Sequence, residues 1–283
     1  MAAYQLAQEA LAGEFAARWG EALAAVEARE IAGSLTELET EYGAAVRESA
    51  AASYALSVVF YRLVRALETG RVIGGPGYRP ASSLGSLWSD FNRATGKRTG
   101  SGPREQLPVD TRNPFPAEDI ARETRRAEEA FREQVADRVA KHERERPGRE
   151  GSAALDDPAL IAWEREFLES LKTGGSGAGG QIVQDGGRDM INNALQDDPG
   201  AIGYYRVTEG SPCYFCALMA ARGAVYKSKR TAAFGAHPHC HCQAVPIFSR
   251  RYQLPDANAK FAGMWREFGG GSLADWRTHY TKT

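Results

Sequence analysis

Cys213-Tyr-Phe-Cys216 begins a stretch that ends in His237-Pro-His-Cys240-His-Cys242 and contains every cysteine of this 283-residue chain. Three of the five histidines lie in the same stretch. Thiolate and imidazole groups are ligands that zinc prefers, and a Cys-x-x-Cys turn directs two sulfurs toward one point. The pattern therefore predicts a tetrahedral zinc site that organises a small C-terminal module.

This stretch offers more ligands than one tetrahedral ion can take. Our first choice is Cys213, Cys216, His237 and Cys242, with Cys240 as a nearly equal alternative to Cys242. The weaker candidates are the two remaining histidines of the stretch, His239 and His241. Three thiolates and one imidazole leave no open position for a substrate water, so we expect one zinc ion with a structural role.

Free thiols, disulfides and redox or catalytic chemistry are the alternatives to zinc. Disulfides fit poorly with a chain that shows no export signal, and a redox Cys-x-x-Cys needs a thioredoxin-like setting that the flanking sequence lacks. The run Pro212-Cys213-Tyr-Phe-Cys216 also matches half of a nucleobase deaminase signature. That signature needs an upstream His-x-Glu, whereas His142 is followed directly by Glu143.

The composition narrows the class of protein. Hydrophobic residues make up 43% of the chain and charged residues 25%, so a buried core is possible. A net charge of -1 disfavours a dedicated nucleic-acid coat protein. The most apolar run, residues 50–67, is interrupted by Arg62 and Arg65, so we expect no membrane span.

The first 173 residues predict a mostly helical region. Apolar residues recur at helical spacing over residues 4–70, with a break at Gly33-Ser34 and a second helix over 35–67. Further helices are predicted over 116–147 and 156–171. Residues 70–113 are rich in glycine and proline and predict a long loop, part of which packs through Trp88 and Phe91.

Glycine dominates residues 174–180, which predicts a hinge. We therefore expect residues 174–200 to comprise this glycine-rich hinge and a short helix over 188–195. The tract lacks the Lys-Ser or Lys-Thr ending of a phosphate-binding loop, so nucleotide binding is not expected.

Residues 201–283 predict the Cys/His module. Strands are expected over 202–207, 224–226 and 243–248, a helix over 216–221, and an aromatic C-terminal tail over 261–280. The predicted fold class is α+β: a mostly helical N-terminal region followed by a small mixed α/β, zinc-stabilised C-terminal module.

Residues 202–250 carry a family resemblance. The Cys-x-x-Cys is followed by Gly223 before a short strand, and His237-Pro-His-Cys240-His-Cys242 leads into Gln-Ala-Val-Pro246. This arrangement resembles the phage Mu F-like head morphogenesis family, which are minor capsid proteins of tailed phages, in the version found in actinobacteriophages. The family commonly has arginine between the last two cysteines, where this chain has His241.

The resemblance implies a structural, non-enzymatic role. Such proteins are present in few copies in the virion, associate with the portal protein at the portal vertex inside the head, and assist head assembly or genome delivery. Assembly would take place in the host cytoplasm, and contact with the inner surface of the major capsid protein is a further expectation. Packaged DNA is a weak candidate partner for the basic clusters, which are more simply solvated (Lys227, Lys229, Arg230, Arg250 and Arg251).

Two other function classes stay open from the sequence. A metal-dependent enzyme acting on nucleic acid would need an open metal site, and a zinc-stabilised adaptor of cellular origin would not associate with capsids. The chain contains neither Gly-x-Ser-x-Gly nor His-Glu-x-x-His, so no fused hydrolase or metalloprotease is expected.

Overall fold

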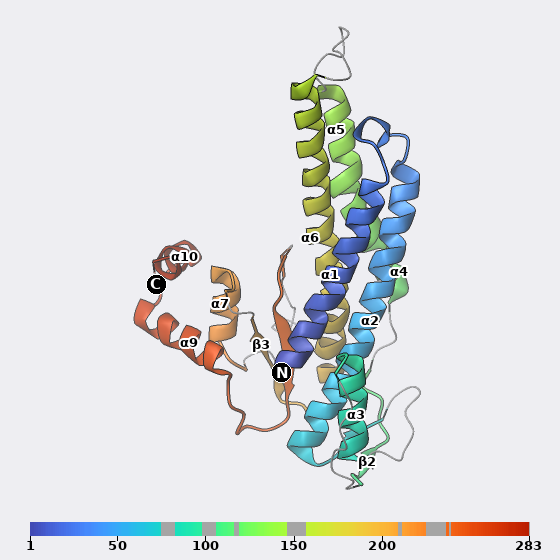
Figure 1. Ribbon diagram of the computed structural model, residues 1–283. Coiled ribbons are helices and arrows are strands. Elements are labelled where there is room, and N and C mark those ends of the chain that lie inside the picture. The colour runs from blue at the N-terminus through green and yellow to red at the C-terminus, as the bar shows by residue number, and fades with distance from the viewer. Residues whose placement is uncertain are drawn as a thin grey trace.

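Long helices packed side by side form the larger part of the molecule (Figure 1). The computed structural model describes residues 1–74, 83–97, 106–115, 119–145, 157–208, 211–224, 236–237 and 239–282. The bundle consists of α1 (Ala2–Ala24), α2 (Leu35–Thr69), α4 (Ile120–Phe131), α5 (Asp137–Glu145) and α6 (Pro158–Asp197). A single π-helical turn, Arg132–Ala136, joins α4 to α5. A short 3₁₀ turn, Ala28–Glu30, separates α1 from α2, so the predicted break before residue 35 is confirmed.

Two apolar clusters fill the bundle along its length. In one, Trp19 packs edge-on against Tyr42 with ring centroids 5.1 Å apart, and Phe131 joins them from α4. In the other, Tyr4 stacks on Phe60 with centroids 3.9 Å apart. Edge-to-face and stacked aromatic pairs of this kind add to the free energy gained from burial alone.

The prediction of a glycine hinge was wrong. Residues 174–180 lie in the middle of α6, which runs unbroken from Pro158 and is capped by Asp157, and the helices predicted over 156–171 and 188–195 are parts of it. Several of these glycines are packing sites: an added Cβ at Gly175 would overlap the Trp19 indole, and one at Gly179 would overlap the Phe15 ring. Close packing against α1 and α2 outweighs the low helix propensity of glycine.

The glycine- and proline-rich segment closes one end of the bundle. Its described part contains β1 (Val72–Ile73), α3 (Leu84–Ala94) and β2 (Val109–Asp110), with β1 parallel to β2. The prediction of a long loop was therefore wrong over these residues, because apolar side chains such as Leu87 and Phe91 of α3 are buried against the bundle. Phe91 is buried while Trp88 is 42% exposed, so the prediction that part of this segment packs is confirmed. The buried Arg65 ties the segment to α6 because its side chain pairs with Asp110 at 3.2 Å and Asp198 at 2.7 Å.

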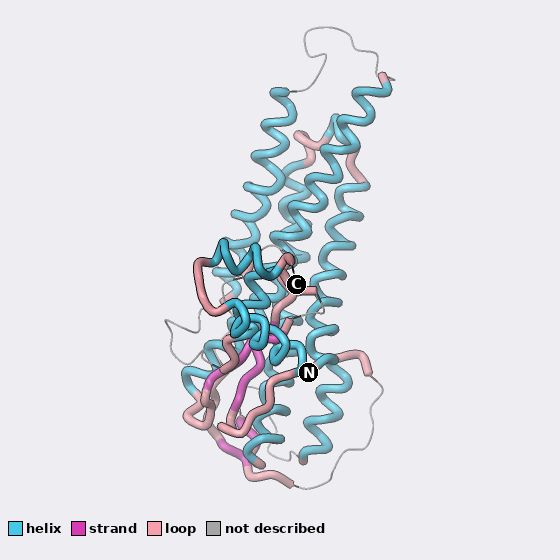
Figure 2. Tube along the Cα trace, turned by 90° about the vertical axis from the view of Figure 1, so that its left-hand side faces the viewer, coloured by secondary structure: helices cyan, strands magenta, loops and turns pink. Residues whose placement is uncertain are grey.

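The C-terminal part is the mixed α/β module that the sequence predicts. The strands β3 (Gly203–Val207) and β4 (Gln243–Ile247) pair antiparallel, with Tyr205 opposite Val245, and every residue of both is buried. The helices α7 (Tyr214–Ala221), α9 (Asp256–Phe268) and α10 (Leu273–Tyr280) lie to one side of the bundle, as Figure 1 shows. Figure 1 also shows β3 between α7 and the bundle, and Figure 2 shows the strands in magenta. The strand expected at 224–226 falls on residues outside those described, apart from Ala224, which lies in a bend.

One described helix, α2, is long and apolar enough to cross a membrane by length and composition, although no span was expected from the sequence. Half of its most apolar window is buried inside the protein. It also carries the buried Ser53, Ser57 and Arg65, which bond to partners within the bundle. A core helix has these properties.

Candidate metal centre

The first two cysteines straddle the start of α7. Cys213 is the N-cap of the helix, and its Sγ accepts a hydrogen bond from the Cys216 backbone N–H at 3.4 Å. Cys216 lies in the first helical turn and is buried, whereas Cys213 is partly exposed. The local Cys-x-x-Cys spacing therefore places both sulfurs at the N-terminal end of one helix, where the helix dipole favours thiolates.

The second half of the cluster is a turn that leads into β4. The Cys240 backbone N–H bonds to the His237 carbonyl at 3.0 Å, and His239 adopts a left-handed backbone conformation with φ 62°. This turn brings the His237 imidazole Nε2 to 3.0 Å from the Cys213 Sγ. It also places the Cys240 Sγ 3.5 Å from the Cys216 Sγ.

All five ligands predicted from the sequence meet here, in two triads that share Cys216. One triad adds Cys213 and His237, the other adds Cys240 and Cys242, and within each triad the donor atoms lie within 4.8 Å of one another. The weaker candidates, His239 and His241, belong to neither triad. The cluster could therefore hold a metal ion.

The donor geometry fits zinc. A tetrahedral ion with Zn–S bonds of about 2.3 Å places ligand sulfurs roughly 3.7 Å apart, close to the Cys216–Cys240 separation. The thiols also compete for protons: the contact with Cys240 raises the pKa of Cys216, and the same contact lowers the pKa of Cys240. Several buried sulfurs at this distance cannot all ionise without a nearby cation, and a bound metal ion would supply that charge.

Side chains of α6 contact the second half of the cluster. The sequence did not predict these contacts. Arg188 is fully buried, and its Nε donates to the Cys242 carbonyl oxygen at 2.8 Å. Gln184 lies 3.2 Å from the His241 Nδ1, and Gln181 donates to the Ala236 carbonyl at 2.9 Å. The spacing of these polar residues on one helical face was the available sequence signal. It was not used because a hinge was predicted over residues 174–180, where α6 is in fact continuous.

Comparison with known protein families identifies the family of this chain. A family model described as VG15 protein matches residues 118–268, more than half of the chain. The chain belongs to the VG15 protein family. This is a phage-associated family, so the chain is a phage-encoded protein, but the match does not single out the Mu F-like family. Comparisons with curated proteins and with solved structures give no match.

The VG15 match begins just before α4 and ends with α9. It therefore contains α6 together with both halves of the Cys/His cluster. The helix that carries Arg188 and the cysteines that it supports lie within one family unit.

The deaminase alternative finds no support in the position of His142. This histidine lies on α5, where its ring stacks on Phe167 and on Trp163 of α6 with centroids 3.5 and 3.7 Å apart. Its ring therefore packs between aromatic side chains, and it is in neither of the two triads.

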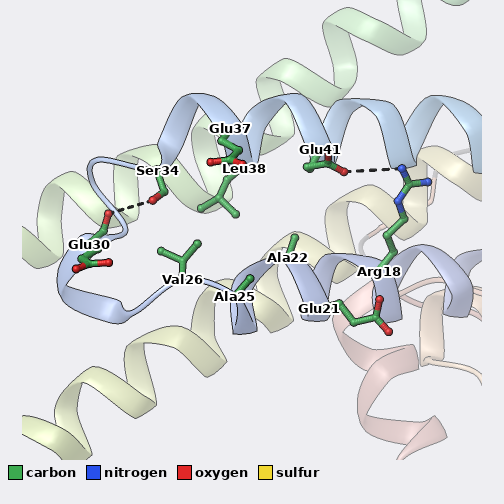
Figure 3. Close-up of a pocket in the computed structure, with 10 residues that line it drawn as sticks. All are labelled: Arg18, Glu21, Ala22, Ala25, Val26, Glu30, Ser34, Glu37, Leu38 and Glu41. Carbon is green, nitrogen blue, oxygen red and sulfur yellow. Dashed lines mark hydrogen bonds and ion pairs between the residues drawn. The ribbon is translucent and has the colours of Figure 1, made fainter.

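A groove near the α1–α2 turn is one of several cavities of similar size among the described residues. It has a volume of about 480 Å³, and Figure 3 shows glutamates from both helices around it. Its apolar lining includes Val26 and Leu38, and Arg18 lies 3.8 Å from Glu41 at one end. The glutamates are exposed, and none belongs to the donor triads found in the described part of the chain.

Proposed function

We propose that this chain is a structural minor capsid protein of a tailed phage, located at the portal vertex inside the head. In this role it assists head assembly or genome delivery and catalyses no reaction. The single observation that carries the proposal is the phage-associated family match, which spans the same Cys/His module that resembles minor capsid proteins.

The metal centre has a structural role in this proposal. Cys216, Cys240 and Cys242 are buried, and the ligands come from two segments that the ion would tie together. A zinc ion with four protein ligands has no open position for a substrate, so it contributes folding free energy and no catalytic step.

The helical bundle supplies the surface for protein partners in this proposal. Its outer faces carry both signs of charge, as expected for contacts with the portal protein or the inner surface of the major capsid protein. Arg250 and Arg251 are both exposed beyond the end of β4 and offer a small basic site for packaged DNA. The lysine-containing cluster at 227–230 lies outside the described residues.

Quantitative mass spectrometry of purified phage heads tests the location. The amount of this chain is compared with those of the major capsid and portal proteins in the same particles. We expect a low, portal-like ratio, and heads assembled without portal protein should lose the chain. Its absence from complete heads would overturn the proposal, and a ratio near that of the major capsid protein would overturn the portal location.

A further inference from the structure

One face of α6 contacts the segment that forms the second half of the metal cluster. Gly177, Gln181, Gln184 and Arg188 follow each other at intervals of four, three and four residues, which places them on one side of a helix. An added Cβ at Gly177 would overlap the His239 ring, so this glycine lets the turn lie against the helix. The segment that carries His237, Cys240 and Cys242 is therefore built directly on the bundle.

Arg188 makes the most extensive contacts on this face. Its Nε donates to the Cys242 carbonyl, its Nη2 to the Cys240 carbonyl and to Gln184, and its Nη1 pairs with Asp185 at 2.9 Å. The planar guanidinium thus holds the backbone of two cysteines at once. A lysine has one ammonium group in place of this fork and could not reproduce both contacts.

The charge of Arg188 also suits a thiolate-rich centre. A zinc ion with three or four thiolate ligands carries a net negative charge, which is costly to bury without a compensating cation. The Asp185 carboxylate pairs with Arg188 and also with Arg126 of α4. Because Asp185 is shared between two arginines, it does not fully neutralise the charge of Arg188. Arg188 therefore combines two properties expected of a residue that supports metal ligands: it fixes their backbone and offsets their charge.

We propose that Arg188 is a positioning residue of the metal centre, which orients Cys240 and Cys242 toward Cys216 and makes metal affinity depend on α6. This inference rests on the structural metal site proposed above. It has a structural consequence: the ion joins α7, which carries Cys213 and Cys216, to a turn held by α6. Metal binding therefore fastens the module formed by α7, α9 and α10 to the bundle.

The test compares Arg188→Lys with Arg65→Lys in the full chain. Arg65 is an equally suitable buried arginine, because it is 3% exposed and forks between Asp110 and Asp198 without contacting the metal ligands. Zinc affinity is measured by competition with a chromophoric chelator, and cobalt substitution reports the tetrahedral thiolate geometry through its visible spectrum. We expect Arg188→Lys to weaken zinc binding by about 10- to 100-fold and to alter the cobalt spectrum. Arg65→Lys should change neither.

Equal zinc affinity of Arg188→Lys and the parent chain would overturn the inference, as would an equal loss in Arg65→Lys, which would indicate a general loss of folding. If the parent chain binds no zinc, the metal site itself fails, and the inference fails with it for that separate reason. Gln184→Met is the second variant if Arg188→Lys does not fold. It removes one acceptor of Arg188 while keeping the side-chain size, and a several-fold loss of zinc affinity is expected. No loss there would also contradict the inference.

Discussion

The bundle and the C-terminal module are held together in different ways. The bundle buries long runs of aromatic and aliphatic side chains between α1, α2, α4 and α6. Among the described residues, the cluster between α7, α9 and α10 has four buried members, Ala217, Ala220, Phe261 and Trp276, with seven partly buried apolar residues packed against them. The strands β3 and β4 pack instead into the large cluster shared with the bundle. The smaller core contributes less free energy than that of the bundle, so we expect these three helices to depend more on the metal ligands. Four substitutions test this difference, and they are taken in order of expected effect.

Cys216→Ser should have the largest effect, because Cys216 is common to both donor triads. Structural zinc contributes on the order of 10 kcal/mol to folding, and losing the shared ligand should remove most of it. We expect the variant to lose its zinc and the amides of α7 and α9 to exchange rapidly, while the bundle stays helical. Zinc content and hydrogen exchange by mass spectrometry measure both results.

Gly263→Ala in α9 is the control on the same module, because an added Cβ there meets no atom within 4 Å. It should retain zinc, and its amides should exchange no faster than those of the parent chain. A Cys216→Ser variant that keeps its zinc and its protection would show that the module folds without the ion, and the contrast with the bundle would then be lost.

Gly179→Ala should have the next largest effect, this time on the bundle. The added methyl group would overlap the Phe15 ring, and overpacking of this kind costs about 1–3 kcal/mol. Urea unfolding followed by the helical circular dichroism signal measures the loss. Zinc content should be unchanged, since the substitution is on the bundle side of α6.

Gly180→Ala is its matched control, one residue further along the same helix. There an added Cβ lies 3.7 Å from the Ala12 Cβ, an ordinary contact. Replacing a helical glycine by alanine should then stabilise the protein by up to about 1 kcal/mol. Stabilisation by both substitutions would mean that the glycine tract is not closely packed and that a hinge is again possible.

Asp189→Asn should have a smaller effect that depends on pH. Burial, reinforced by the neighbouring Asp185 carboxylate, raises the pKa of Asp189 from 3.8 to about 6, against the opposing charges of Arg122 and Arg126. The folded protein therefore holds this proton more tightly than the unfolded chain does. The stability contributed by the group is present at low pH and is lost as the pH rises from about 4 through 6.

Asparagine does not titrate. We therefore expect the change in the free energy of unfolding caused by Asp189→Asn to be about 1–2 kcal/mol more stabilising at pH 8 than at pH 4. The gain is limited because the side chain is 29% exposed and pairs with Arg122 at 3.0 Å. Urea unfolding at the two pH values measures the difference. A variant whose effect is the same at both pH values would contradict the raised pKa.

Tyr280→Phe should have the smallest effect and concerns only the module. The Tyr280 hydroxyl donates to the Pro212 carbonyl at 2.7 Å, next to the first metal ligand. Its loss should cost about 1 kcal/mol, visible as faster exchange in α10 with zinc still bound. Destabilisation of the bundle by the same substitution would show that the two regions unfold as one.

The elements predicted from the sequence are those specified by residues close together in the chain. The α1–α2 break, β3 and β4 follow from local turn residues and apolar spacing, and the donor set follows from residue type and short spacing. These signals need no knowledge of distant partners, because hydrogen bonds within a helix and a Cys-x-x-Cys turn are local.

The glycine tract and Arg188 show what local signals could not provide. Glycine next to glycine predicts a flexible break, and only the arrival of Trp19 and Phe15 from α1 turns those positions into close contacts within a helix. In the sequence, Arg188 is one charged residue of a predicted short helix, with no local sign of a special role. In the structure, the turn that contains Cys240 and Cys242, more than fifty residues later in the chain, places two carbonyl oxygens against its guanidinium.

The sequence by itself determined the α+β class, the positions of most helices of the bundle and of α7, β3 and β4, and the five donors that could hold a metal ion. The tertiary structure decided that α6 is continuous and that the metal centre is built on it. The physical reason is that helix propensity and ligand chemistry are properties of single residues and near neighbours. Close packing and the burial of a paired charge arise only when distant segments meet.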